Sequence, residues 1–524
     1  MKAPDLPRCA PEEVGISSRQ VERCIRALNH EYTTMNGFMA ARHGKVFSQC
    51  WWAPFSCEMP HSNHSLGKTY TATAIGIAMG EGLLDLDEKI TDIFGEKIRQ
   101  EHLAVPPGLE KITVRHILTM TNGMAYNPDM RGDFVANYLT TPLAYEPGTH
   151  FSYNSTGSCM LGAIILLRTG QNLKEYLTPR LFQKIGIDPE RFVWRQFRGT
   201  GIDGEPGTFS TTEDNLRLAM CYLDGGRWEG EQVIPERYVR EALQIQISTA
   251  HAPEQKDGRC GYGYQLWACS KPGVFRFDGG QGQYCLLWPE KDLVISLHEG
   301  ALGPLGPQKT LDVLYETLLN DIADVPLPRD GAALASLRET EVSRALEAAP
   351  GTEVPPDGSF SGTYQVTDGT FDPWLSASPP GSGDLFQVFR TPEKDVPIRR
   401  FSLLVQEQVL RLVLDTGAEL EARWDGTLTA GFVDSPYDRL GDYAATARCM
   451  ADGSLTLHIH WLNGWFETEI TFSKTTAGLA VTTRKLRLNA GDNFLVYLAQ
   501  ADYGAPGSGT EIPLLGSFHG IFLP

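Results

Sequence analysis

The first 325 residues mix helix-like and strand-like hydrophobic patterns. After Ser18, apolar side chains recur every three or four residues, which predicts an amphipathic helix carrying Val21, Cys24, Ile25 and Leu28. The same kind of spacing predicts helices over residues 114–120, 159–168 and 213–223. Paired apolar runs flank the His43-Gly44 turn and the turn at residues 289–292, so a hairpin is predicted at each place.

Beyond residue 325 the pattern becomes one of strands. Residues 326–358 hold several prolines around a short charged stretch, and we interpret them as a linker. Residues 359–524 are mostly strand-like. Within them, residues 455–461 alternate strictly, which puts the apolar side chains on one face and His458 and His460 on the other. Frequent turn signals between short strands predict a C-terminal all-β domain, either a barrel or a sandwich.

Length and charge narrow the class of protein. A chain of 524 residues is too long for one ordinary core and favours two domains. The net charge of −18 argues against a nucleic-acid partner, since phosphate binding needs a basic surface. No apolar run reaches the roughly 20 residues of a membrane-spanning helix, and the N-terminus lacks the apolar core of a signal peptide. We therefore expect a cytoplasmic protein with no membrane partner, for which an oligomer is possible.

Metal and disulfide chemistry are not expected. The ten cysteines are scattered and form no Cys-x-x-Cys pair, so we expect reduced thiols that pack as small apolar groups. His458 and His460 share a strand face that would suit a metal, but the sequence nearby offers no evident third ligand. Two ordinary surface histidines are the expected outcome, with no metal and no cofactor.

The segment with candidate chemistry is Ser65-x-x-Lys68. Ser65 stands where a helix is expected to begin, and positions i and i+3 share a helix face, so the amine can reach the hydroxyl. A serine hydroxyl is a weak nucleophile until a base takes its proton, and a buried lysine is one such base. This short pattern occurs about once or twice by chance in a chain of this length. However, the dozen residues after Lys68 carry almost no charge, which predicts a buried helix and a buried lysine.

Several segments, in this order, resemble the serine β-lactamase and penicillin-binding-protein superfamily. Its class C-like branch, with esterases, D-aminopeptidases and amide hydrolases, is the most similar one. The first of these segments is Ser65-x-x-Lys68, and the resemblance as a whole covers roughly residues 10–322. It continues through residues 80–87, 113–123, 145–155, 279–284 and 288–294. It implies an α/β domain in which helices flank an antiparallel sheet beside a helical subdomain, with the serine between them.

The resemblance also implies roles for individual residues. Ser65 would be the acylated nucleophile, Lys68 its base, and Tyr153 the group that moves protons between nucleophile, leaving group and water. The backbone N–H groups of Ser65 and Gln283 would form the oxyanion hole. For Tyr153, the alternative is a buried tyrosine whose hydroxyl bonds the backbone.

Two departures from the family pattern affect the predicted substrate site. Where the family has Tyr-x-Asn, this chain has Tyr153-Asn154-Ser155, so either Ser155 keeps a polar role or Asn154 turns inward. The third motif, which usually carries Lys or His, is here Gly280-Gln281-Gly282. Without that cation, efficient action on substrates with a carboxylate is not expected. Asp278 either meets a cationic substrate amine or is an ordinary turn residue.

The sequence therefore predicts a serine hydrolase. It would cleave an ester or amide bond of a small molecule or short peptide through an acyl-enzyme on Ser65. Two alternatives stay open: an acyltransferase that uses the same acyl-enzyme, and a catalytically silent binding protein on the same fold. The sequence assigns no catalytic role to the C-terminal β domain.

Overall fold

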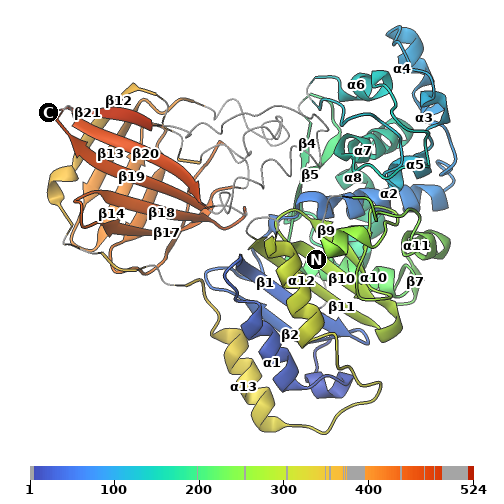
Figure 1. Ribbon diagram of the computed structural model, residues 1–524, viewed down its shortest axis with the longest axis horizontal. Coiled ribbons are helices and arrows are strands. Elements are labelled where there is room, and N and C mark those ends of the chain that lie inside the picture. Colours follow the sequence, from blue (N-terminus) through green and yellow to red (C-terminus); the bar gives the residue numbers. More distant parts are fainter. Residues whose placement is uncertain are drawn as a thin grey trace. The chain divides into compact units, whose positions relative to one another are not determined.

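The computed structural model describes residues 5–523. The gaps in that range are residues 131, 198, 253–254, 302–304, 348–349, 353, 355, 370, 372, 375–395, 437–439, 465–466, 477 and 487–516. The described chain folds as two compact units (Figure 1). One holds residues 5–52 and 56–344. The other holds residues 53–55 together with the described residues from 345 onward. Each unit is taken by itself below.

A six-stranded antiparallel sheet forms the centre of the first unit. Its strand order is β2-β1-β11-β10-β9-β8. The strands are β1 (Thr33–Arg42), β2 (Lys45–Trp51), β8 (Trp267–Ala268), β9 (Phe275–Gly279), β10 (Gln283–Trp288) and β11 (Leu293–Ala301). The two predicted hairpins are confirmed as β1–β2 and β10–β11.

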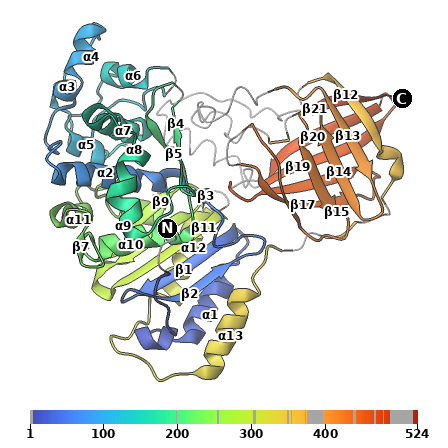
Figure 2. The same ribbon diagram turned by 180° about the vertical axis from the view of Figure 1, so that it is seen from behind.

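Helices cover both faces of this sheet (Figures 1 and 2). On one side lie α1 (Ser18–Ala27), α12 (Leu305–Thr317) and α13 (Gly331–Val342), and on the other lies α10 (Thr212–Leu223). Side chains of β11 point alternately to the two faces of the sheet, and their contacts identify the helices on each face. Ser296 donates a hydrogen bond to a carbonyl at the start of α10, whereas Glu299 accepts one from Thr310 of α12. Because α13 packs on α1 and β2, part of the predicted linker over residues 326–358 belongs to this unit.

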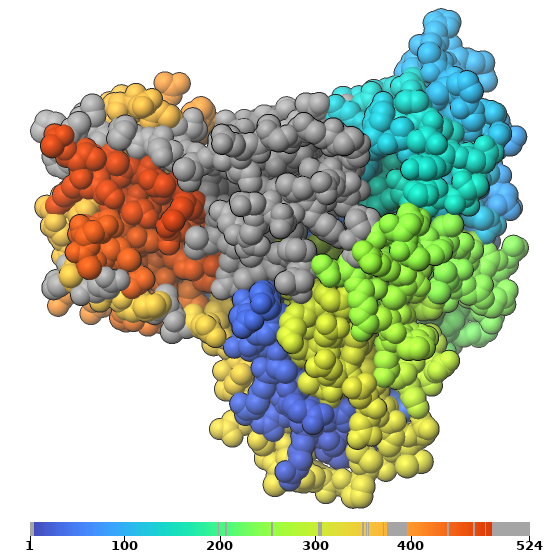
Figure 3. Space-filling model, viewed as in Figure 1, coloured from blue at the N-terminus to red at the C-terminus, as the bar shows by residue number. Residues whose placement is uncertain are grey.

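A helical region adjoins the sheet and includes the long helices α2 (Gly67–Gly80) and α7 (Ser155–Thr169), which pack together. The shorter helices are α3 (Ile90–Ile93), α4 (Gly95–Gln100), α5 (Val114–Leu118), α6 (Phe134–Thr140), α8 (Leu173–Leu177), α9 (Gln183–Ile185) and α11 (Glu236–Ala242). A small sheet orders β3 (His61–Ser62), β5 (Asp203–Ser210) and β4 (Val193–Gln196), and β6 (Arg227–Trp228) pairs with β7 (Glu231–Gln232). In the space-filling view the helical region, blue to cyan, continues into the green surface of the sheet region (Figure 3).

The helix predictions are confirmed with small shifts of boundary. Helices α1, α5, α7 and α10 occupy the four predicted places. Helix α2 is buried over residues 67–78, as its nearly uncharged sequence predicted. Among the described residues, no helix has the length and apolar character to cross a membrane.

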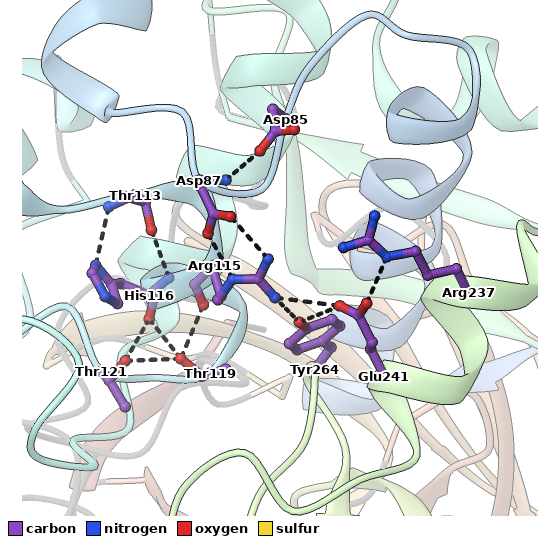
Figure 4. Close-up of polar contacts among 10 residues, drawn as sticks. All are labelled: Asp85, Asp87, Thr113, Arg115, His116, Thr119, Thr121, Arg237, Glu241 and Tyr264. Carbon is purple, nitrogen blue, oxygen red and sulfur yellow. Dashed lines mark hydrogen bonds and ion pairs between the residues drawn. The ribbon is translucent and has the colours of Figure 1, made fainter.

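Arg115 fixes the position of α5 within the helical region (Figure 4). Its guanidinium donates hydrogen bonds to Asp87 at 2.7 Å, to Glu241 of α11 at 3.3 Å and to the hydroxyl of Tyr264. Arg115 is only partly buried, but its guanidinium joins three segments that are distant in sequence. Two residues after α5, the carbonyl of Met120 accepts a 2.9 Å hydrogen bond from the N–H of Ser152, which directly precedes the second motif, Tyr153-Asn154-Ser155.

The second unit is a ten-stranded sheet with strand order β15-β14-β13-β12-β21-β20-β19-β18-β17-β16. A further pairing of β15 with β17, at Arg423 and Thr446, brings the two ends of the sheet together. The predicted all-β domain is therefore a nearly closed barrel. Its strands are β12 (Gly362–Asp368), β13 (Arg400–Val405), β14 (Val409–Leu414), β15 (Glu419–Arg423), β16 (Thr429–Phe432), β17 (Asp442–Cys449), β18 (Leu455–Trp461), β19 (Glu467–Thr475), β20 (Gly478–Leu486) and β21 (Ser517–Leu523).

Candidate active site

Ser65 and Lys68 are in direct contact. Ser65 lies in a short 3-10 turn, His64–Leu66, and α2 begins immediately after it at Gly67. The Lys68 Nζ and the Ser65 Oγ share a hydrogen bond of 2.7 Å, which is the contact that the three-residue spacing predicted. Lys68 is 1% exposed, while Ser65 remains partly accessible. A buried amine thus lies beside an accessible hydroxyl.

The turn that presents Ser65 is held in an uncommon backbone conformation. His64 has a φ of 48°, in the left-handed region that non-glycine residues rarely occupy. Asn63 holds the turn through two backbone hydrogen bonds. Its N–H donates to the carbonyl of Thr208 at 2.9 Å, and its own carbonyl accepts from the N–H of Leu66 at 3.1 Å. Strained backbone of this kind is maintained only where the surroundings fix the chain firmly.

A buried polar cluster extends from Asn63 to the central sheet. The Asn63 Oδ1 accepts hydrogen bonds from Asn215 at 3.0 Å and Ser210 at 2.9 Å, and lies 3.2 Å from the His298 Nε2. Burial, together with the neighbouring His61 ring, lowers the pKa of His298 well below its ordinary value. A neutral His298 can therefore support the turn through Asn63 without adding a charge to this cluster.

Tyr153 lies beside this pair. The Lys68 Nζ is 4.8 Å from the centroid of the Tyr153 ring. The same ring stacks on Trp267, with centroids 6.0 Å apart and planes at 19°. Trp267 belongs to a buried cluster with Met120, Phe151 and Tyr262, against which the half-buried Tyr153 packs. The fold therefore brings together the three residues to which the family resemblance gave proton-transfer and nucleophilic roles.

The next two residues of the second motif have different surroundings. Asn154 is 2% exposed and caps α7, since its Oδ1 accepts a hydrogen bond of 2.6 Å from the N–H of Gly157. Its Nδ2 lies 3.8 Å from the sulfur of Met124. Its carboxamide is thus engaged inside the fold. Ser155 is the first residue of α7 and is partly exposed.

Gln265 joins the helices that carry the first two motifs, and sequence reasoning missed it. Its side chain donates to the carbonyl of Ile117 at 3.0 Å and accepts from Ser158 of α7 at 2.8 Å. Its carbonyl accepts from Thr69 of α2 at 3.3 Å. Gln265 has a φ of 57° and is 3% exposed. The sequence carries no signal for this role, which depends on contacts between distant segments.

Gly279 and the glycines of the third motif allow β9 and β10 to lie close to the His64–Leu66 turn. A Cβ on Gly279 would lie 2.1 Å from the carbonyl oxygen of Asn63, and one on Gly280 would be 3.7 Å from the His64 ring. Gln281 and Gly282 both have positive φ, 65° and 86°, and form the turn to β10. Gln283 begins β10 directly opposite Gly279. This register keeps the backbone of Gln283 near the His64–Leu66 turn.

The side chain of Gln283 has a separate, structural contact. Its Nε2 donates a 2.5 Å hydrogen bond to the carbonyl of Glu299 on β11, and the residue is fully buried. The amide side chain is thus directed into the sheet. Only the backbone N–H of Gln283 is left for the oxyanion role that the resemblance implied.

Asp278 is paired with a buried cation that sequence reasoning also missed. The Arg276 Nε donates to the Asp278 Oδ2 at 2.6 Å, and Arg276 itself is 4% exposed. The guanidinium also bonds the carbonyls of Asp257 and Ala268 and lies 5.6 Å from the Trp267 ring centroid. A substrate amine at Asp278 would therefore share the carboxylate with Arg276.

Comparison with known proteins identifies similar sequences and structures. A 6-aminohexanoate-dimer hydrolase of Paenarthrobacter ureafaciens is 25% identical over 296 residues, covering 51% of this chain and 72% of that protein. Penicillin-binding protein 4 of Amycolatopsis lactamdurans is 26% identical over 317 residues, covering 53% and 81% respectively. The solved structure of a putative 6-aminohexanoate-dimer hydrolase from Bacillus anthracis has a TM-score of 0.45 at 16% identity, over 65% of this chain and 87% of that one.

The sequence model of the Beta-lactamase family matches residues 21–309, which is more than half of the 524-residue chain. That range includes the turn that carries Ser65, the Tyr153-Asn154-Ser155 segment and the turn at residues 280–282. The resemblance noted from the sequence is thereby confirmed, and the chain belongs to the Beta-lactamase family, whose members are serine hydrolases and their relatives.

Proposed function

We propose that this protein is a serine hydrolase that cleaves a small ester or amide through an acyl-enzyme on Ser65. The observation that carries the proposal is the 2.7 Å contact between the buried Lys68 amine and the Ser65 hydroxyl, with Tyr153 alongside. A solvated lysine capping a helix would have its amine in water. Here the amine is withdrawn from water and bonded to the hydroxyl of a partly exposed serine.

The proposed reaction has two steps. In the first, the Ser65 Oγ attacks the carbonyl carbon while its proton passes to the Lys68 amine, and the backbone N–H groups of Ser65 and Gln283 stabilise the oxyanion. Tyr153 delivers its proton to the leaving alcohol or amine as the C–O or C–N bond breaks. In the second step water attacks the acyl carbonyl and gives a proton to the Tyr153 oxygen, and Lys68 returns its proton to the Ser65 Oγ as the acid is released.

The charges around the site favour an uncharged or cationic substrate. Arg276 lies on β9, just before the third motif, and its charge is already matched by Asp278 at 2.6 Å. A substrate carboxylate would compete with Asp278 for a guanidinium that is buried. We therefore infer an acyl group without a carboxylate next to the scissile bond.

Labelling with a fluorophosphonate tests the nucleophile. The wild-type chain is expected to be labelled at one site. Ser65→Ala is expected to lose the label, whereas the matched control Ser56→Ala, at an exposed serine nine residues earlier, keeps it. Lys68→Met should slow labelling by roughly 10²–10⁴-fold, because the proton acceptor is removed. Wild-type protein that takes up no label would instead support a silent binding protein.

The fate of the acyl group separates hydrolysis from transfer. With a chromogenic acyl ester, Tyr153→Phe should keep the single labelling event but lose turnover by roughly 10²–10⁴-fold. An added alcohol or amine acceptor should leave the free acid as the main product. An acylated acceptor as the main product would identify the protein as an acyltransferase.

A further inference from the structure

Strand pairing in the C-terminal barrel brings two histidines and a glutamate together. His458 and His460 lie two residues apart on β18 and therefore share one face of the strand. Glu467 of β19 is directly opposite His460. The alternation that made these histidines visible in the sequence did not show the carboxylate, because it depends on which residue of β19 pairs with β18.

The three side chains meet at their donor atoms. The His458 Nε2 is 2.7 Å from one oxygen of Glu467, and the His460 Nδ1 is 3.3 Å from the other. One donor atom from each residue lies within 4.8 Å of the other two. The two imidazole rings are stacked, with centroids 4.6 Å apart and planes at 28°. Two rings on neighbouring positions thus converge on one carboxylate.

The cluster is largely withdrawn from solvent. The side chains of His458, His460 and Glu467 are 26%, 12% and 6% exposed. The two histidines are therefore less exposed than the ordinary surface histidines that the sequence led us to expect. A largely buried carboxylate beside two imidazoles is a donor set of the kind that binds metal ions.

We propose that His458, His460 and Glu467 bind one divalent transition-metal ion of the zinc type. Imidazole nitrogen and carboxylate oxygen are donors that Zn²⁺ prefers, at about 2.0–2.2 Å. Tetrahedral bonds of that length put neighbouring donors about 3.3 Å apart. The two His–Glu pairs are 2.7 and 3.3 Å apart, and the three donors all lie within 4.8 Å of one another, so rotations of the side chains would bring them to that spacing. Three protein ligands leave a fourth position for water or another ligand.

The neighbouring positions on the same face leave room for an ion. Across β17, His460 is opposite Ala444 and His458 is opposite Thr446, both with short side chains. Across β19, His458 is opposite Glu469, whose carboxylate is ion-paired with Arg484 of β20. The residues directly opposite the two histidines are therefore two short uncharged side chains and two glutamates, one of which is Glu467. Arg448 of β17 lies one pair further along the same face, opposite Thr456.

Metal titration of the full chain tests the proposal. After treatment with a chelator, the wild-type protein is expected to bind one equivalent of Zn²⁺ by calorimetry and to develop the visible absorption of a low-symmetry Co²⁺ site. Glu467→Gln, close to the same shape, should weaken both by more than about tenfold. The matched control His43→Ala, which removes a histidine of the β1–β2 turn paired with Asp292, should leave them unchanged.

Two results would overturn the metal site. One is the absence of a saturable one-equivalent event in the wild type, and the other is equal binding by wild type and Glu467→Gln. Circular dichroism of each variant verifies that the barrel is folded. Fluorophosphonate labelling of Ser65 should not change when metal is removed, so failure of the metal site and failure of the proposed hydrolase activity are distinguishable.

Discussion

Glu299 is a buried carboxyl whose replacement by glutamine should flatten the pH dependence of stability. It lies on β11 directly behind the turn of the third motif, and a Cβ on Gly282 would be 1.9 Å from its Oε1. Its Oε2 accepts hydrogen bonds from Thr33 at 2.5 Å and Thr310 at 2.9 Å. The Oε1 has no hydrogen-bond partner within the part of the chain that the structure describes.

The size of the effect follows from the pKa of Glu299. Burial raises this pKa from 4.5 to about 8, although the two threonine hydroxyls oppose the shift. Between these values the folded protein keeps a proton that the unfolded chain has lost, so rising pH favours unfolding. The stabilisation is complete below the unfolded pKa of 4.5 and is lost as pH rises to about 8. Over 8 − 4.5 = 3.5 units, at ~1.36 kcal/mol per unit, the loss reaches up to roughly 5 kcal/mol.

Denaturant unfolding of wild type and Glu299→Gln at several values of pH measures this difference. The amide can still accept from both threonine hydroxyls and does not ionise, so the variant should be favoured progressively more as pH rises. Other buried carboxyls contribute slopes of the same sign, Asp203 among them, because burial raises its pKa to about 7. The quantity to compare is therefore the difference between the two proteins. Parallel stability curves from pH 5 to 8 would refute the assignment of a neutral Glu299.

Two further substitutions test how the site is held. Asn154→Ala removes the cap of α7 and should lower the free energy of unfolding by about 1–2 kcal/mol, measured by urea denaturation; an unchanged midpoint would show that the cap contributes nothing. Gly279→Ala places a methyl group 2.1 Å from the carbonyl of Asn63 and should displace the nucleophile turn, reducing the labelling rate of Ser65 by more than about tenfold. The matched change Gly280→Ala meets its nearest atom at 3.7 Å and should label within a few-fold of wild type, so equal losses in both variants would contradict this account.

Features that depend on short stretches of chain could be predicted from the sequence. The periodicity after Ser18 predicted α1, and the uncharged run after Lys68 predicted the buried α2. Contact between Lys68 and Ser65 follows from helix geometry over three residues. The family resemblance then supplied what local patterns cannot, namely the fold of the sheet and the approach of Tyr153.

Features that depend on register or on distant contacts could not be predicted in this way. Glu467 meets His460 only because β19 pairs with β18 in one of several possible registers. Gln265 is a single polar residue in a segment full of aromatics, and its bonds to α5 and α7 exist only in the folded chain. Arg276 and Asp278 are two apart on one strand face, but the sequence does not show that the guanidinium is buried.

The Arg276–Asp278 pair bears on how the oxyanion is stabilised. A buried ion pair has little net charge at a distance, so it adds little to the field at the Ser65 hydroxyl. In the proposed mechanism the Lys68 amine takes up the Ser65 proton and so becomes positively charged during the attack. Negative charge on the oxyanion would then develop together with positive charge on Lys68. The backbone N–H donors would supply the remaining stabilisation of the oxyanion. Such an arrangement needs no anchoring charge on the substrate, which is the physical reason to expect a neutral acyl group.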